Sequence, residues 1–244
     1  MYHQISEEIF NPKFFSNKIE KLGARDVHLW GLTGSVCNVQ KNYSDYFLDD
    51  DEQSRAMKFR FRKDHDLYVI GRHFTKIMLA YYTDCTPDSV KITEGSFGKP
   101  SCEMNLFFNI SHSGDHLLLG FSNLDIGVDI ERIDPSVDIK RIGKRHFSKI
   151  EFQKMMSCAE DERVKSFFEI WTKKEAFIKG IGEGLSVPLK DFNVTSPNGK
   201  VLWELSPEKN YGNWYVHDIE SNQGFKSAFA TQSELVDISY YRHD

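Results

Sequence analysis

The sequence of 244 residues is longer than the usual single domain of about 100 to 150 residues, so it predicts two packed lobes. Hydrophobic residues make up 40% of the chain and charged residues 27%, which supplies material for a core and excludes global disorder. The formal net charge of −5 argues against nucleic-acid binding through the overall field, so any phosphate site must be a local basic pocket.

The amino terminus and the cysteines narrow the class of protein further. The first residues lack a basic segment followed by an apolar one, and no apolar run approaches the roughly 20 residues that cross a bilayer. We therefore expect a cytoplasmic protein with no membrane partner. Cys37, Cys85, Cys102 and Cys158 lie far apart without a C-x-x-C pair, so we expect free thiols rather than a zinc cluster or disulfides.

Helical patterns come first along the chain. Asp49–Glu52 is an acidic helix start, because Asp49 can cap the helix and Glu52 stands three residues later. Apolar residues then recur at helical spacing from Leu67 to Tyr81, and Pro87 lies just beyond the predicted end. The spacing predicts a helical region with one buried stripe.

Short apolar runs replace the helical pattern from Phe107 onward. The runs Phe107–Ile110 and Leu117–Phe121 flank the turn-rich insert Ser111–Asp115, which predicts a strand, a turn and a strand. A third run, Ile126–Ile130, follows the short break Ser122–Asp125. We place the boundary between the two lobes at this break.

The second half predicts one long helix followed by strands. The helix runs from about Arg163 to Lys179 and ends at a series of glycines. Predicted strands follow at 201–205, 214–217 and 225–230. The predicted fold class is α+β, with an N-terminal lobe of residues 1–124 and a C-terminal lobe of residues 125–244.

Two carboxylates on the strand after the boundary point to a metal. Successive strand residues face opposite sides, so Asp129 and Glu131 project together, away from Val128 and Ile130. A bound divalent cation commonly offsets the repulsion between two such carboxylates. Mg²⁺ suits this position because it accepts a few carboxylates together with water and phosphate oxygens. The alternative is two solvated acids, with Glu131 paired to a neighbouring base such as Arg132.

The long helix adds a third carboxylate and a cation. Trp171, Glu175 and Lys179 stand at four-residue intervals and share one face. In an isolated helix, Glu175 and Lys179 would form an ordinary ion pair. Opposite a strand that carries Asp129 and Glu131, the same face supplies a third metal ligand and a cation for a phosphate.

Four segments in fixed order connect these patterns to a known family. They are Phe97–Pro100, Phe108–Ser113, Ile126–Glu131 and Trp171–Lys179, the last followed by Gly182–Leu185. Together they resemble the Sfp-type 4'-phosphopantetheinyl transferases. The likeness spans about residues 97 to 193, with a fainter continuation from Arg55 to Arg72.

The resemblance implies two similar α+β lobes in a pseudo-twofold arrangement, with coenzyme A in the cleft between them. The implied reaction moves 4'-phosphopantetheine from coenzyme A to a serine of an apo acyl or peptidyl carrier protein and releases adenosine 3',5'-bisphosphate. Mg²⁺ is the implied cofactor, which Mn²⁺ could replace. Because both lobes lie in one chain, we expect a monomer.

The resemblance also assigns roles to individual positions. Asp129, Glu131 and Glu175 look like the metal ligands, and Glu175, Lys179 and His112 are the candidate catalytic residues. Arg55 and Arg72 would meet the 3'-phosphate of the donor, and Lys179 its pyrophosphate. The full set of donor-binding candidates is Arg55, Arg72, Lys99, Pro100, Ser111, His112, Asp129, Lys174, Glu175 and Lys179.

The chemistry leaves one role open and two other functions to consider. Either Glu175 or a water on the metal takes the proton of the carrier serine. Another Mg²⁺-dependent phosphotransferase is one alternative, although the sequence has no G-x-x-x-x-G-K-[ST] loop. A carrier-binding module without turnover is the other, although such a module has no evident need for the charges of Asp129, Glu131, Glu175 and Lys179.

Overall fold

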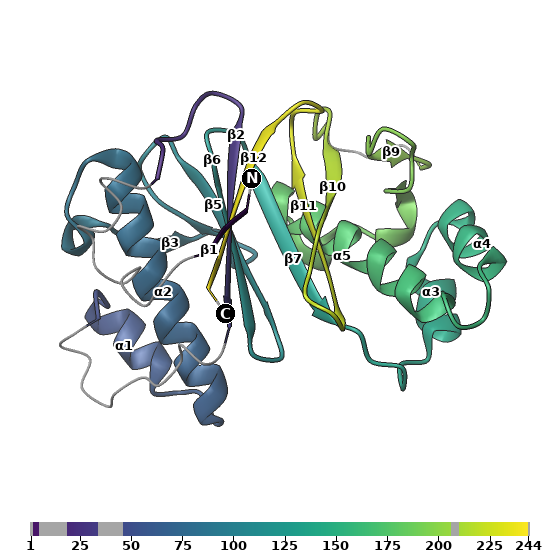
Figure 1. Ribbon diagram of the computed structural model, residues 1–244, viewed down its shortest axis with the longest axis horizontal. Helices are drawn as coiled ribbons and strands as arrows, with labels where there is room; N and C mark the ends of the chain where they lie inside the picture. Colours follow the sequence, from purple (N-terminus) through teal and green to yellow (C-terminus); the bar gives the residue numbers. More distant parts are fainter. Residues whose placement is uncertain (1, 5–18, 34–45, 206–209, 244) are drawn as a thin grey trace.

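The computed structural model describes residues 2–4, 19–33, 46–205 and 210–243. The described elements are a mixture of helices and strands, which confirms the α+β class. In Figure 1 two sheets lie face to face in the middle of the molecule, and helices cover the outer side of each. Each half therefore pairs one sheet with one long helix.

The first sheet has five described strands in the order β1-β12-β2-β6-β5, covered by helices α1 and α2. Strand β6 pairs antiparallel with β2 and with β5, whereas β12 pairs parallel with β1 and with β2. The elements are β1 (Tyr2–Gln4), β2 (Asp26–Thr33), α1 (Asp50–Ala56), α2 (Arg62–Thr83), β5 (Phe107–Ser113), β6 (His116–Ser122) and β12 (Asp237–His243).

The predicted helical region from Asp49 consists of two helices, α1 and α2. Asp49 caps α1 through a complete capping box with Glu52, as the sequence predicted, and α1 ends at Ala56. The long helix α2 begins at Arg62 and ends before Asp84, which adopts a left-handed conformation (φ 55°). Pro87 begins a short 3₁₀ helix beyond that end, Pro87–Ser89.

The hairpin turn between β5 and β6 is shorter than predicted. Ser111, His112 and Ser113 belong to β5, and only Gly114 and Asp115 form the turn. Gly114 has φ +63°, a conformation that glycine adopts without strain, so two residues suffice to reverse the chain. The predicted turn-rich insert therefore begins with three polar strand residues and contains only a two-residue turn.

The second sheet has three described strands in the order β10-β11-β7, and α5 packs on its outer side. Helix α5 extends to Ile181 and ends at Gly182, close to the prediction. The predicted strand at 201–205 is reduced to two residues, β9. The elements are β7 (Ile126–Arg132), α3 (Ile139–His146), α4 (Lys149–Ser157), α5 (Arg163–Ile181), β8 (Phe192–Asn193), β9 (Leu202–Trp203), β10 (Tyr215–Ile219) and β11 (Phe225–Thr231), with short 3₁₀ helices at Gly184–Ser186 and Leu189–Asp191.

Strand β12 crosses the expected division of the chain. It follows the second sheet in sequence but pairs with β2 in the first sheet, from Asp237 opposite Asp26 onward. A cluster of buried side chains also joins the inner faces of the two sheets, with Leu118 of β6 and Val128 of β7 among its members. The two halves thus share a core, and the last strand belongs structurally with residues 1–124.

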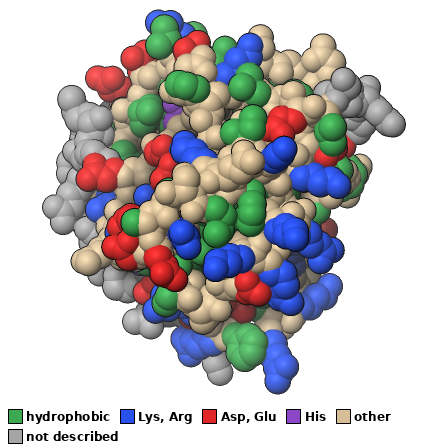
Figure 2. All heavy atoms as spheres, turned by 90° about the vertical axis from the view of Figure 1, so that its right-hand side faces the viewer, with side chains coloured by type: hydrophobic (Ala, Val, Ile, Leu, Met, Phe, Trp, Pro, Cys, Tyr) green, Lys and Arg blue, Asp and Glu red, His purple; other side chains and the backbone are tan. Residues whose placement is uncertain are grey.

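The end of the molecule formed by α3 and α4 is basic, although the chain is acidic as a whole. Figure 2 looks onto this end and shows Lys and Arg side chains gathered over much of it. Exposed cations on or beside these helices are Lys140, Arg141, Lys144, Arg145, Lys149 and Lys154. A net charge of −5 therefore coexists with a locally positive surface.

The described residues bear on the expected free thiols and on membrane-spanning helices. Cys85, Cys102 and Cys158 are free thiols, as predicted, and Cys37 lies outside the described residues. Among the described helices, none is long and apolar enough to span a membrane.

Candidate functional site

The two sheets meet where β5 and β7 run side by side. Asn109, Ser111 and Ser113 alternate along β5, and each accepts a hydrogen bond from a backbone N–H of β7. The partners are the N–H groups of Val128 (2.9 Å), Ile130 (3.4 Å) and Arg132 (3.0 Å). Side chains thus satisfy the edge of β7 where a neighbouring strand would otherwise pair.

The same two hydroxyl groups orient the carboxylates of β7. Ser111 donates to Oδ1 of Asp129 at 2.9 Å, and Ser113 donates to Oε2 of Glu131 at 3.0 Å. Asp129 is 2% exposed, so its orientation is fixed by these contacts rather than by solvent. The strand alternation predicted from the sequence places both carboxylates beside β5.

Helix α5 brings the third carboxylate and the lysine, because two glycines allow close approach. A Cβ atom on Gly127 would lie 2.0 Å from the carbonyl oxygen of Ala176, and one on Gly180 would lie 2.6 Å from the Trp214 ring. With α5 this close to β7, Nζ of Lys179 contacts Oδ1 of Asp129 at 2.6 Å and Oγ of Ser111 at 2.8 Å. The structure thus brings Lys179 of α5 to Asp129 of β7 and Ser111 of β5.

The carboxylates share one electrostatic environment. Burial raises the pKa of Asp129, which Lys179 and Ser111 partly offset, and burial and the charge of Asp129 raise the pKa of Glu131. Burial and the charges of Asp129 and Glu131 raise the pKa of Glu175 to about 7, against the opposing effect of Lys179. Three acids thus face one base.

The donor set fits a hard divalent cation, although the carboxylates are not gathered into a ready metal site. Among the described residues, no group of three or more His, Cys, Asp or Glu side chains is positioned to hold a metal ion. However, Oδ2 of Asp129 is buried and, within that part of the chain, has no hydrogen-bond partner. A buried carboxylate oxygen without a donor, beside two further acids, is the chemistry that Mg²⁺ relieves.

Lys174 does not belong to this site, contrary to the prediction that it binds the donor. Its side chain is fully buried in the second half and pairs with Glu151 of α4 at 2.7 Å. Its ammonium group also donates to the carbonyl oxygens of Leu189 (2.7 Å) and Phe192 (2.6 Å). All three N–H groups are engaged by these contacts, so Lys174 has a structural role.

Lys99 lies where the two halves meet. Its ammonium group donates to the carbonyl oxygen of Gly180, near the end of α5, and to Asp125 at 3.3 Å. Its neighbours Gly98 and Pro100 line a cleft on the first half. The structure therefore brings Pro100 to the lining of this cleft and directs the Lys99 side chain toward α5.

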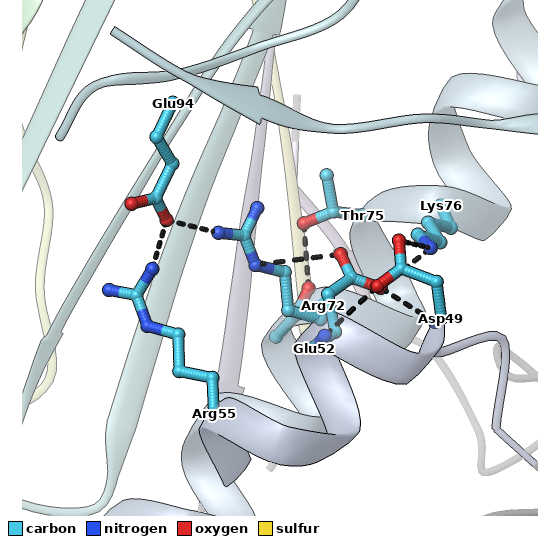
Figure 3. A network of polar contacts seen from close by, with 8 residues as sticks. Asp49, Glu52, Arg55, Arg72, Thr75, Lys76 and Glu94 are labelled. Carbon is cyan, nitrogen blue, oxygen red and sulfur yellow. Dashed lines mark hydrogen bonds and ion pairs between the residues drawn. The ribbon is translucent and has the colours of Figure 1, made fainter. Parts of the chain in front are cut away.

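This cleft has a volume of about 330 Å³ and collects several of the other predicted residues. Arg55 at the end of α1 and Arg72 of α2 lie on one side, with the ring of Tyr68 5.5 and 5.6 Å from their guanidinium carbons. Figure 3 shows both arginines pointing toward Glu94 of the short strand β3 (Thr93–Glu94), which pairs with β4 (Pro100–Ser101). The prediction that Arg55 and Arg72 act together is compatible with this geometry.

His112 connects the cleft to the carboxylates. It lies on β5 between Ser111 and Ser113, so its side chain projects to the opposite face, where it lines the cleft with Ile110. Burial and the charge of Lys179 lower the pKa of His112, against the charges of Asp64 and Asp129. One strand thus separates an arginine-lined cleft from an acid-rich cluster, each within electrostatic reach of His112.

Asn109 and Ser113 have a role that was not predicted from the sequence. Both lie within the motif Phe108–Ser113, and their period of two with Ser111 is the signal that places the three side chains on one face of a strand. A cleft lined by two arginines, next to an acid-rich cluster, is typical of enzymes that transfer a phosphate-linked group.

Comparisons with known proteins identify the family. A model described as 4'-phosphopantetheinyl transferase superfamily matches residues 125–231, and one described as 4'-phosphopantetheinyl transferase, N-terminal, matches residues 40–122. The chain is 31% identical over 186 residues to the 4'-phosphopantetheinyl transferase Sfp of Bacillus subtilis (75% of this chain, 81% of Sfp). It is 32% identical over 200 residues to the transferase HetI of Nostoc sp. (76% of this chain, 84% of HetI). The crystal structure of holo-[acyl-carrier-protein] synthase from Thermotoga maritima matches with a TM-score of 0.34 and 21% identity, over 44% of this chain and 61% of that one.

The chain therefore belongs to the 4'-phosphopantetheinyl transferase superfamily. The transferase function predicted from the four motifs is confirmed, and no relative found favours either alternative, the unrelated phosphotransferase or the module without turnover.

Proposed function

We propose that this enzyme transfers 4'-phosphopantetheine from coenzyme A to a serine of an acyl or peptidyl carrier protein, using the two sites that flank β5. The observation that carries the proposal is the contact of Lys179 with Asp129 and Ser111, next to a cleft that holds two arginines. A donor with a pyrophosphate and a separate phosphate needs two such anion-binding positions. Every part of both positions comes from one chain, which supports a working monomer.

Asp129, Glu131 and Glu175 would hold the metal ion, Mg²⁺ or in its place Mn²⁺. The support is the buried oxygen of Asp129 without a donor and the excess of negative charge around it. Once bound, the ion would neutralise charge that develops on the phosphates as the bond to the leaving group breaks.

The remaining work falls to side chains. Lys179 is 31% exposed, so its ammonium group can bind a phosphate oxygen while it keeps its contact with Asp129. His112 can donate a hydrogen bond into the cleft from the other face of β5. Arg55 and Arg72 would bind the 3'-phosphate at the far end of the donor.

Glu175 is the proposed base for the carrier serine. It lies on the helix face of Lys179, and among the described residues it makes no hydrogen bond or ion pair that would hold it away from a substrate. A carboxylate in that position can accept the serine proton as the oxygen attacks phosphorus.

The test is transfer itself. We expect incubation of the protein with coenzyme A, Mg²⁺ and an apo carrier protein to add one phosphopantetheine group to the carrier, as measured by mass spectrometry. Chelation of divalent cations with EDTA should stop the gain, and added Mg²⁺ should restore it. No gain on any of several acyl and peptidyl carriers would refute the proposed function. The cytoplasmic location and the absence of nucleic-acid and membrane partners stay predictions from the sequence.

A further inference from the structure

Glu94 lines the arginine-lined cleft and contacts both of its arginines. Its Oε1 atom contacts Nη2 of Arg72 at 2.7 Å and also pairs with Nη1 of Arg55, so two guanidinium groups meet on one carboxylate oxygen (Figure 3). The side chain of Arg72 is only 9% exposed, whereas that of Glu94 is 33% exposed. An anion that can reach solvent therefore covers a nearly buried cation.

The charges around this contact cancel. Glu52 pairs with Lys76 at 2.6 Å and lies 3.9 Å from Arg72, and Asp49 lies 3.5 Å from Lys76. The network thus contains three acids and three bases: Asp49, Glu52 and Glu94 with Arg55, Arg72 and Lys76. With Glu94 in place, the cleft offers an incoming phosphate little net positive charge.

Arg72 nevertheless keeps unused binding capacity. Its Nη1 atom is buried and, within the described part of the chain, has no hydrogen-bond partner. A buried guanidinium N–H without an acceptor is costly, and a ligand with several acceptor oxygens would remove that cost. A single carboxylate satisfies only part of this fork.

Glu94 can move without disturbing the core. It lies on β3, a two-residue strand that pairs only with β4 among the described strands and whose residues are both exposed. Arginine forks bind carboxylate and phosphate with the same geometry, and a phosphate brings more charge and one more oxygen. A phosphate can therefore replace this carboxylate.

We propose that Glu94 is an internal competitor for the phosphate of the donor: it holds Arg55 and Arg72 in place in the free enzyme and is displaced when the phosphate binds. The inference rests on the proposed function, because it requires the donor to lie in this cleft. Its consequence is a lower affinity for the donor that carries the 3'-phosphate. A donor that lacks this group does not compete with Glu94, so the competitor narrows the difference in affinity between the two donors.

Replacement of Glu94 by glutamine tests the competition. We measure binding of coenzyme A and of 3'-dephospho-coenzyme A by calorimetry for the wild-type enzyme, Glu94→Gln and Asp64→Asn. Asp64 lines the same cleft, but in the described residues it makes no ion pair with either arginine, so Asp64→Asn removes the same charge without removing the competitor. We expect Glu94→Gln to bind coenzyme A about tenfold more tightly and Asp64→Asn less than about twofold more tightly. Binding of 3'-dephospho-coenzyme A should change less than about twofold in either variant, because no phosphate competes with Glu94 there.

The outcomes separate the two proposals. If Glu94→Gln binds coenzyme A no better than the wild-type enzyme, or no better than Asp64→Asn, Glu94 is not a competitor and the inference fails while the proposed function stands. An equal gain for both donors would also overturn it, because the effect would not depend on the 3'-phosphate. Failure of the wild-type enzyme to bind coenzyme A at all would overturn the proposed function and this inference with it.

Discussion

The two halves of the molecule both place charged side chains on a long helix, but they balance them differently. The network around Arg72 and Lys76 of α2 has as many bases as acids, and each acid is paired. The cluster beside α5 has three acids, Asp129, Glu131 and Glu175, and one base, Lys179. A balanced network stabilises the structure, and one of its ion pairs must break before it can bind an anion. An acid-rich cluster, in contrast, attracts a cation. This difference is the reason we propose the metal for one half and the 3'-phosphate of the donor for the other.

The largest expected effect is loss of activity from the acid-rich cluster. Asp129→Ala or Glu175→Ala should lower turnover by about 10³-fold or more, even at high Mg²⁺, because each would remove a proposed metal ligand and a charge that the transition state depends on. Transfer to an apo carrier, measured by mass spectrometry, gives the rate. Glu169→Ala, which removes a partly exposed acid from the same helix, should retain activity and serves as the matched control. Unchanged turnover in both Asp129→Ala and Glu175→Ala would refute the proposed metal site.

Lys174 tests whether α5 also carries a purely structural pair. Lys174→Met leaves Glu151 buried without its cation, so the free energy of unfolding should fall by about 3 to 5 kcal/mol. Urea unfolding measures this loss. The double variant with Glu151→Gln should recover part of it, because it removes the unpaired buried charge, and the single glutamine oxygen can still accept from one of the two backbone N–H groups, of Ser148 or of Val194, that now donate to separate carboxylate oxygens.

The same variant decides the role that the sequence assigned to Lys174. At a temperature where Lys174→Met is folded, the KM for coenzyme A should be unchanged, whereas Lys179→Met should raise it. A raised KM in folded Lys174→Met would restore Lys174 to the donor site and contradict its structural role.

Local patterns predicted the catalytic half well, because period-two and four-residue spacings determine which face a side chain occupies. These spacings alone predict that Asp129 and Glu131 share one face of a strand and that Glu175 and Lys179 share one face of a helix. Lys174 was misassigned because it stands next to Glu175, and adjacent helix residues point about 100° apart, so neighbours in sequence lie in different environments. Its burial depends on Glu151, more than twenty residues away, and no local pattern encodes that contact.

The first sheet shows the other limit of sequence patterns. Strands β2 and β12 pair in parallel although about 200 residues separate them, from Asp26 with Asp237 onward. Such a pairing is selected by burial and by the sheet as a whole, and not by any turn signal between the two strands. Local sequence patterns therefore did not predict that the last strand, β12, completes the sheet of the first lobe.

His73 sharpens the comparison through pH. It lies on α2 beside the balanced network, its Nδ1 atom accepts the backbone N–H of Phe47 at 3.2 Å, and burial lowers its pKa from 6.5 to about 4. The unfolded chain therefore binds a proton that the folded protein does not between these pH values, so stability falls as pH drops from about 6.5 to 4. A pKa shift of this size corresponds to about 3 kcal/mol of unfolding free energy.

The control removes the titrating ring. Urea unfolding at pH 7, 6, 5 and 4 should show a weaker loss of stability toward acid for His73→Gln than for the wild-type protein. Equal slopes for the two would mean that protonation of His73 does not contribute to acid destabilisation.

The smallest expected effect comes from Asp49, the outermost acid of the balanced network. It accepts the backbone N–H of Glu52 at 2.9 Å as the cap of α1, and its side chain is 49% exposed where it meets Lys76. Asp49→Ala removes the cap and the charge and should lower the free energy of unfolding by about 1 kcal/mol. Asp49→Asn keeps a capping oxygen and removes only the charge, so it should cost only a few tenths of that, because half-exposed ion pairs contribute little. If Asn is as costly as Ala, the charge of Asp49 matters more than its cap, and the network on α2 is held together by its outermost pair as well as by its buried ones.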